Sequence, residues 1–200
     1  MDLTNRAGIR REIRKRRQTL DAGKQRLFSC QMAGRVRRDP LFRNSRSIGA
    51  YLPADGEISP LPLLESAWLT GKKVYLPVLV PFSANRLWFA AFDPGDRLVS
   101  NRFGILEPAR VHWRRIPAYA LDLVLAPLVA FDAQGNRLGM GGGFYDQSFA
   151  FLHRRHNWIK PRLLGLAYEL QHMDRIPSQK WDVPLHGIAT EQKIYHCSCS

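Results

Sequence analysis

An apolar run followed closely by a glycine-rich loop sets the strongest constraint on how this chain can fold. Residues 121–126 read Leu-Asp-Leu-Val-Leu-Ala, which is typical of a strand buried in a sheet. Five glycines then occur in nine residues, from Gly135 to Gly143, and a helix is predicted from Phe144 to about His156. Strand, loop and helix in this order predict an α/β unit whose loop lies beyond the carboxyl end of a sheet strand.

The rest of the chain continues this alternation. Asp39-Pro40 is expected to end a helix, and Pro77 is expected to end a strand. Helices are predicted at 5–20, 22–38 and 60–70, strands at 47–52, 73–76, 87–92, 163–167 and 187–190, and irregular structure at 93–120. The pattern predicts an α/β fold, a single domain over 1–200 with a largely parallel sheet and helices on both faces.

Positive charge is concentrated near the start of the chain. Residues 1–46 hold fourteen Lys and Arg against four acids, which accounts for +10 of the net charge of +13. A polyanion, either a nucleic acid or a nucleoside triphosphate, is therefore expected near the first two helices. Arg6, Arg10 and Arg14 share one helix face. They either meet phosphates from the side opposite the glycine loop or form a solvated basic face.

Several functional classes are disfavoured. No apolar run is long enough to cross a membrane, and the arginine-rich start has no signal-peptide core, so we expect a cytoplasmic protein. Three cysteines, two of them Cys197 and Cys199 near the end, do not suggest a disulfide framework. The six histidines include no H-x-x-x-H pair, and no Ser–His–Asp signature is present.

The glycine-rich loop itself is suited to binding phosphate. Glycine tolerates positive φ and has no side chain, so successive N–H groups can converge on an anion. Arg137 adds a permanent charge, and Asp146, in the first turn of the next helix, can hold Mg²⁺ while phosphates complete its coordination. The stretch is neither a Walker A loop nor G-x-G-x-x-G. A flexible loop, with Asp146 merely improving the helix start, remains the other interpretation.

Acids elsewhere are weaker candidates. Asp55-Gly56 fits a simple turn, whereas Glu57 can hydrogen-bond a polar heterocycle. Near the carboxyl terminus, Asp182 and His186 are possible further metal or base residues, and surface solvation is the competing interpretation.

Residues 131–146 resemble the signature of the 5-formyltetrahydrofolate cyclo-ligase family, also called methenyltetrahydrofolate synthetases. The helix that carries Arg6 and Arg10 and the segments 55–58, 103–108 and 181–185 resemble the family in the same order, so the resemblance covers nearly the whole chain. It implies a three-layer α/β sandwich of the kind shared with sugar-phosphate isomerases and CoA transferases. It also implies ATP as co-substrate, Mg²⁺, and cyclisation of 5-formyltetrahydrofolate to 5,10-methenyltetrahydrofolate through an N5-iminium phosphate, with release of ADP and phosphate.

The resemblance also implies roles for individual residues. ATP would be bound by Arg6, Arg10, Arg137, Leu138, Gly139, Met140, Gly141, Gly142, Gly143, Phe144 and Tyr145. The folate would be bound by Leu52, Glu57, Phe103, Met140, Gly143 and Phe144, with Arg137 and Asp146 catalytic and Asp146 holding the metal. Two positions depart from the family: many members have an acid where this chain has His186, and their loop often has a basic residue where this chain has Met140 and Gly142.

Two other functions remain open: a basic nucleic-acid-binding module, and a family member that binds folate without turnover. The first leaves the glycine loop and Asp146 unexplained, so we expect small-molecule substrates and no nucleic-acid partner. A monomer without a membrane partner is expected as well. We also expect Asp146→Ala to abolish turnover while the fold survives, because an acid on the surface at a helix start contributes little to stability.

Overall fold

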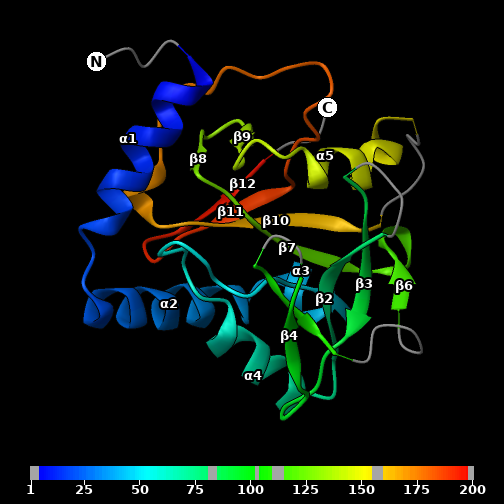
Figure 1. Ribbon diagram of the computed structural model, residues 1–200. Coiled ribbons are helices and arrows are strands. Elements are labelled where there is room, and N and C mark those ends of the chain that lie inside the picture. Colours follow the sequence, from blue (N-terminus) through cyan, green and yellow to red (C-terminus); the bar gives the residue numbers. More distant parts are fainter. Residues whose placement is uncertain (1–4, 81–84, 102–103, 110–114, 155–159, 198–200) are drawn as a thin grey trace.

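The computed structural model describes residues 5–80, 85–101, 104–109, 115–154 and 160–197. They form an eight-stranded sheet with the order β12-β11-β10-β7-β1-β2-β3-β6 (Figure 1). The five strands from β11 to β2 run parallel, and β12, β3 and β6 are antiparallel to their neighbours. The strands are β1 (Ser47–Gly49), β2 (Lys73–Leu79), β3 (Leu87–Ala91), β6 (Arg115–Pro117), β7 (Leu123–Pro127), β10 (Arg162–Leu166), β11 (Gly187–Ala189) and β12 (Ile194–His196). The predicted α/β class and largely parallel sheet are confirmed.

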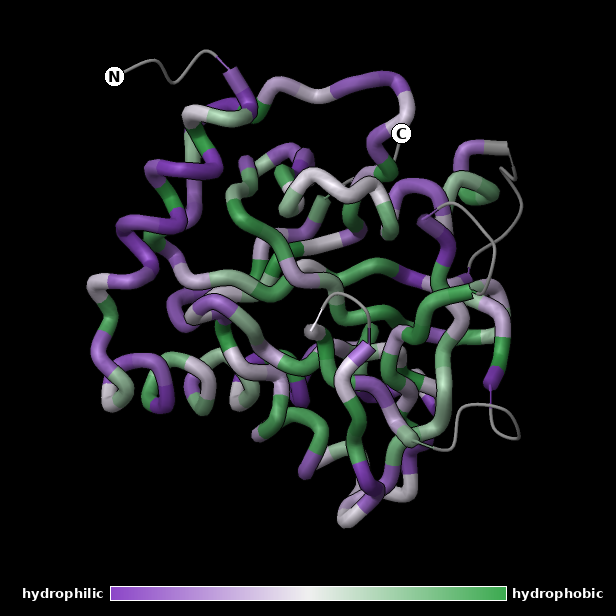
Figure 2. The backbone as a smooth tube through the Cα atoms, in the orientation of Figure 1, coloured by the Kyte–Doolittle hydropathy of each residue, from purple (hydrophilic) through white to green (hydrophobic). Residues whose placement is uncertain are grey.

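The sheet is covered on both faces because its central strands are apolar on both. In β7, Leu123 and Leu125 pack into the cluster beneath α2 (Ala22–Val36) and α4 (Leu61–Leu69). Val124 and Ala126 point the other way, into the cluster that includes Phe149 of α5 (Phe144–Phe149). Alternate residues of a strand face opposite sides of the sheet, so this run needs cover on both. The hydrophobic central strands stand out in Figure 2.

Prolines account for two wrong boundaries. The second helix ends at Val36, and Asp39-Pro40 starts a short helix, α3 (Pro40–Arg43), because the Asp39 carboxylate accepts the Leu41 N–H. Pro77 lies inside β2 rather than ending it. The pairing of β2 with β1 extends only to Tyr75, so Pro77 lies where one side of β2 has no partner strand and a missing N–H is tolerated.

The segment predicted as irregular is more ordered than expected. Residues 93–120 contain a hairpin of β4 (Leu98–Ser100) and β5 (Leu106–Pro108), followed by β6 and a 3₁₀ turn at Ala118–Ala120. The fifth helix is shorter than predicted, since α5 passes into a 3₁₀ helix at Ala150–Arg154. The strand β12 was also missed. These elements are short and their sequences lack a clear periodicity. Contacts in the folded chain, rather than local sequence, therefore determine where they form.

The connections of the sheet create a crevice between β1 and β7. The chain leaves β1 toward β2 on one side, whereas β7 and its successors lie on the other. The loops that follow β1 and β7 therefore diverge, and ligands bind at such switch points beyond the carboxyl ends of the strands. The glycine-rich loop follows β7 through a small hairpin of β8 (Ala130–Phe131) and β9 (Arg137–Leu138). No helix in the described part of the chain is long and apolar enough to cross a membrane.

Candidate active site

A cavity of about 940 Å³ occupies this crevice and gathers most of the predicted site residues. Its lining includes Arg6, Arg10, Leu52, Glu57, Arg137, Gly139, Met140, Gly141, Gly142, Gly143, Phe144, Tyr145 and Asp146. Leu138 does not line the cavity, because it is fully buried against Ile9 and Ile13. Phe103 lies outside the described residues. The size suits one large ligand or two smaller ones bound side by side.

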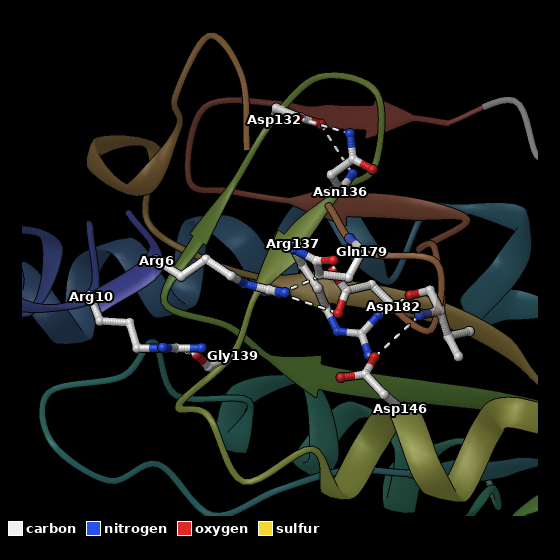
Figure 3. Close-up of polar contacts among 10 residues, drawn as sticks. Arg6, Arg10, Asp132, Asn136, Arg137, Gly139, Asp146, Gln179 and Asp182 are labelled. Atoms are coloured by element: carbon white, nitrogen blue, oxygen red, sulfur yellow. Dashed lines mark hydrogen bonds and ion pairs between the residues drawn. The ribbon is translucent and has the colours of Figure 1, made fainter. Parts of the chain in front are cut away.

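Asp132 organises the start of the glycine-rich loop. Its fully buried carboxylate accepts hydrogen bonds from the N–H groups of Gln134 and Asn136, from the Asn136 side chain, and from the Ile176 N–H. Four donors offset the cost of burying the carboxylate and hold the β8–β9 turn in one shape (Figure 3). Asp132 is therefore structural, and it places the loop that follows.

Gly141 and Gly143 of the loop have backbone conformations that L side chains rarely adopt. Gly141 has φ of 106° and Gly143, which precedes α5, has φ of 66°. The chain can therefore turn sharply above the cavity and present backbone groups to it. A Cβ at Gly141 would meet the Arg10 guanidinium at 3.5 Å, whereas one at Gly139 would meet nothing within 4 Å.

Helix α1 (Arg6–Gln18) lies beside the loop, and its Arg6 and Arg10 line the cavity. The Arg10 Nε donates to the Gly139 carbonyl at 2.8 Å, and Arg6 Nη2 donates to both Asp182 carboxylate oxygens at 3.2 and 3.0 Å (Figure 3). The Arg6 Nε is buried and has no hydrogen-bond partner among the described residues. A buried donor of this kind remains available to an acceptor on a ligand.

Arg137 is paired with Asp146 rather than standing free. Its Nη2 lies 2.7 Å from Asp146 Oδ1, its Nη1 donates to the Val183 carbonyl, and its side chain is only 5% exposed. The Val183 N–H donates to the same Asp146 oxygen at 3.2 Å. Asp146 is thus the counterion of a buried cation, and the expectation that it is an ordinary surface acid is wrong. Its Oδ2 has no hydrogen-bond partner among the described residues.

Much of the cavity lining is apolar, and Glu57 lies among it. Tyr51, Leu52, Leu76, Leu128 and Phe144 are among its lining residues. Burial raises the pKa of Glu57, so that its carboxyl holds a proton more readily than an exposed one. Burial also raises the pKa of Tyr145, whose hydroxyl has no partner within the described part of the chain. The cavity therefore combines arginine side chains with apolar walls and isolated polar groups.

The sequence marks Asp182 and His186 only as possible metal or base residues, and the structure gives the two different surroundings. Asp182 lines the cavity and binds Arg6, although 176 residues separate them. The W-D-V-P-L segment was the available signal. His186 precedes β11 and lies at the amino end of the parallel strands, the edge opposite the cavity. Its Nδ1 accepts the Leu163 N–H at 3.0 Å, and burial, helped by Arg162, lowers its pKa to about 4. It is a neutral structural side chain in this fold.

Comparisons with known proteins agree with this architecture. The sequence model of the 5-formyltetrahydrofolate cyclo-ligase family matches residues 2–191. The 5-formyltetrahydrofolate cyclo-ligases of Escherichia coli and Haemophilus influenzae are each 40% identical to this chain, over 185 and 190 residues, covering 92% and 94% of it and 98% of each relative. The NMR structure of Aquifex aeolicus 5,10-methenyltetrahydrofolate synthetase superposes with a TM-score of 0.80 at 27% identity, covering 98% of this chain and 94% of that one.

Proposed function

This chain belongs to the 5-formyltetrahydrofolate cyclo-ligase family and is an enzyme of that family, and from this premise we propose how its cavity performs the reaction. ATP binds between the glycine-rich loop and the arginines of α1. The reduced folate binds against the apolar walls beside Glu57. The observation that carries this arrangement is that one cavity is lined by the arginines of α1, the glycine-rich loop, Asp146, and apolar side chains beside Glu57.

The ATP phosphates are assigned to arginine side chains, which carry a permanent charge and, in Arg6, an N–H group without a partner in the described structure. Arg10 lies across the glycine-rich loop at Gly139, and Arg6 has a buried Nε without a partner in the described structure. The loop has no basic side chain between Gly139 and Gly143, so the cations near it come from α1: Arg10 contacts the loop at Gly139, and Arg6 lines the same cavity. Positioning and neutralisation of charge are the main requirements of phosphoryl transfer.

The residues present suit Mg²⁺ held by one carboxylate. No group of three or more His, Cys, Asp or Glu that could hold a metal is formed by the described residues, which argues against a closed protein site. Mg²⁺ commonly uses one or two carboxylates, with phosphates and waters completing six ligands. Asp146 Oδ2 meets this requirement, and Arg137 holds the other oxygen. When bound, the ion would neutralise charge on the transferring phosphoryl group.

The folate position is assigned by the mixture of apolar walls and isolated polar groups. Leu52 and Phe144 supply surface for the pterin ring system, while Met140 lies 52% exposed at the rim. Glu57, whose pKa is raised by burial, accepts or donates hydrogen bonds at the pterin. Phe103 and Gly143 are also expected to contact the folate, as the family resemblance implies.

The proposed reaction has two bond-forming steps. The formyl oxygen attacks the γ-phosphorus of ATP and ADP leaves, giving an N5-iminium phosphate. N10 then attacks the iminium carbon, its proton is released, and the carbon–oxygen bond breaks with loss of phosphate. The products are 5,10-methenyltetrahydrofolate, ADP and phosphate. Arg10 and the loop hold the phosphates, and the apolar walls exclude water that would otherwise compete for the phosphoryl group.

The test follows the near-ultraviolet absorbance of 5,10-methenyltetrahydrofolate when purified protein, 5-formyltetrahydrofolate and Mg·ATP are mixed. The expected result is a signal that requires both ATP and Mg²⁺. Binding of folate without any such signal would instead support a non-catalytic member. Duplex or single-stranded DNA retained on filters, with an affinity that falls steeply with salt, would support the nucleic-acid alternative.

A further inference from the structure

Asp55 and Glu57 belong to one closed turn. The Glu57 N–H donates to the Ala54 carbonyl at 2.9 Å, and the Ala54 N–H donates to Glu57 Oε2 at 3.1 Å. The two central residues, Asp55 and Gly56, have φ of 49° and 69°, values that Asp and Gly tolerate best. Because the turn is closed at both the backbone and the side chain, the position of Glu57 depends on that of Asp55.

Asp55 is in turn bound to the far end of helix α1. Its Oδ2 accepts from Arg14 Nε at 2.7 Å and from Arg17 Nη2 at 2.8 Å, and Gln18 approaches Oδ1 at 3.4 Å. The Arg17 side chain is fully buried, and its guanidinium has no other hydrogen-bond partner in the part of the chain that is described. A buried cation without its anion is costly, so this pair is a firm connection. The bond from Arg14 lowers the pKa of Asp55, which stays ionised at neutral pH.

The same helix carries Arg6 and Arg10, which also line the cavity, and Arg10 contacts the glycine-rich loop at Gly139. Arg6 and Arg17 are eleven residues apart, which is about 17 Å along an α-helix. Between them, only Ile9 and Ile13 of α1 are buried, in the cluster with β8 and β9. Helix α1 is also attached by polar contacts, through Arg10 to the Gly139 carbonyl and through Arg14 and Arg17 to Asp55. Its position is therefore shared between the glycine-rich loop at one end and the turn of Glu57 at the other.

We propose that Asp55 is a positioning residue that couples the two substrate positions, by fixing the turn of Glu57 to the helix whose Arg10 contacts the glycine-rich loop. The inference rests on the proposed function, since it takes ATP at the arginines and folate at Glu57. Binding of nucleotide fixes the position of Arg10 and so of α1, and through Arg14 and Arg17 it fixes the position of the turn. The folate then binds a site that no longer has to be organised, so each substrate tightens the binding of the other by the same factor.

The test measures that factor directly. Calorimetry gives the dissociation constant of 5-formyltetrahydrofolate with and without Mg²⁺ and a non-hydrolysable ATP analogue, and the ratio is the coupling factor. The expected factor exceeds one in the wild type. Arg14→Gln should reduce it by up to about fivefold, as for an exposed ion pair, and Asp55→Asn should reduce it further. The matched control is Arg16→Gln, which removes the same charge from the same helix but breaks only an exposed pair with Glu12.

Arg14→Gln keeps the test interpretable if Asp55→Asn folds poorly, because the Arg14 side chain is 44% exposed. A purely structural role for Arg14 would change the melting temperature and leave the coupling factor at its wild-type value. A wild-type factor of one, or equal factors in Arg14→Gln and Arg16→Gln, would overturn the proposal. Failure of the proposed function is distinct, because it appears as wild-type protein that produces no methenyl product with Mg·ATP.

Discussion

The ion pair between Arg137 and Asp146 predicts that removing one charge affects both stability and turnover. Arg137 Nη2 lies 2.7 Å from Asp146 Oδ1, with side-chain exposures of 5% and 25%. Breaking a buried pair costs about 3–5 kcal/mol because it leaves an uncompensated charge. Since Asp146 is a quarter exposed, water screens part of this loss, and we expect about 2–3 kcal/mol for Asp146→Asn. For a domain of this size, the melting temperature should fall by about 5–10 °C.

Thermal unfolding of purified protein measures the stability, and product absorbance at increasing Mg²⁺ measures turnover. Asp146→Asn should show both the lower melting temperature and a loss of turnover that excess Mg²⁺ restores only in part. Asp174→Asn, which removes an exposed acid, should match the wild type. In the double variant Arg137→Met/Asp146→Asn much of the lost stability should return, because no unpaired charge remains buried.

The outcomes separate two views of Asp146. If Asp146→Asn melted within about a degree of the wild type and lacked turnover, Asp146 would be the surface acid expected from the sequence, and the buried-pair argument would fail. If it retained full turnover at low Mg²⁺, its role at the metal would be refuted. A double variant that is less stable than either single variant would show that the pair does not explain the loss.

Three further predictions follow from the cavity. Glu57→Gln should weaken folate binding and stabilise the fold at pH 7, because burial raises the pKa of Glu57 and penalises its ionised form. Urea unfolding measures this gain as the increase in the free energy of unfolding of the variant over the wild type. The increase should shrink as the pH falls from the raised pKa of Glu57 toward its unfolded value of 4.5, and an equal increase at all pH values would contradict burial of the ionised carboxyl as the cause. Arg10→Ala should raise the KM for ATP about tenfold or more, as for a charged hydrogen bond, while Arg16→Ala should not; equal KM values would make α1 a solvated face. Gly141→Ala should raise the same KM because of its φ of 106° and the nearby Arg10, whereas Gly139→Ala, which has open space, should be tolerated; equal effects would exclude conformation as the reason.

Local patterns in the sequence were enough to place the main parts of the site. The apolar run of β7 followed by closely spaced glycines locates a ligand loop at the carboxyl end of a central strand, and the structure has it there. The spacing of Arg6 and Arg10 fixes them on one helix face because a helix repeats every 3.6 residues. Both inferences depend only on residues that are close together in the sequence, which is why the structure agrees with them.

Which charges meet was decided by the tertiary structure alone. With 30 Lys and Arg and 17 Asp and Glu, the sequence offers many pairings and no rule for choosing among them. Packing brought Asp182 to Arg6, placed Asp146 against Arg137, and turned Asp55 from a plain turn residue into the anion of a buried arginine. It also put His186 at the edge of the sheet away from the cavity. Periodicity is a local property of the backbone, whereas an ion pair depends on where the fold brings distant segments together.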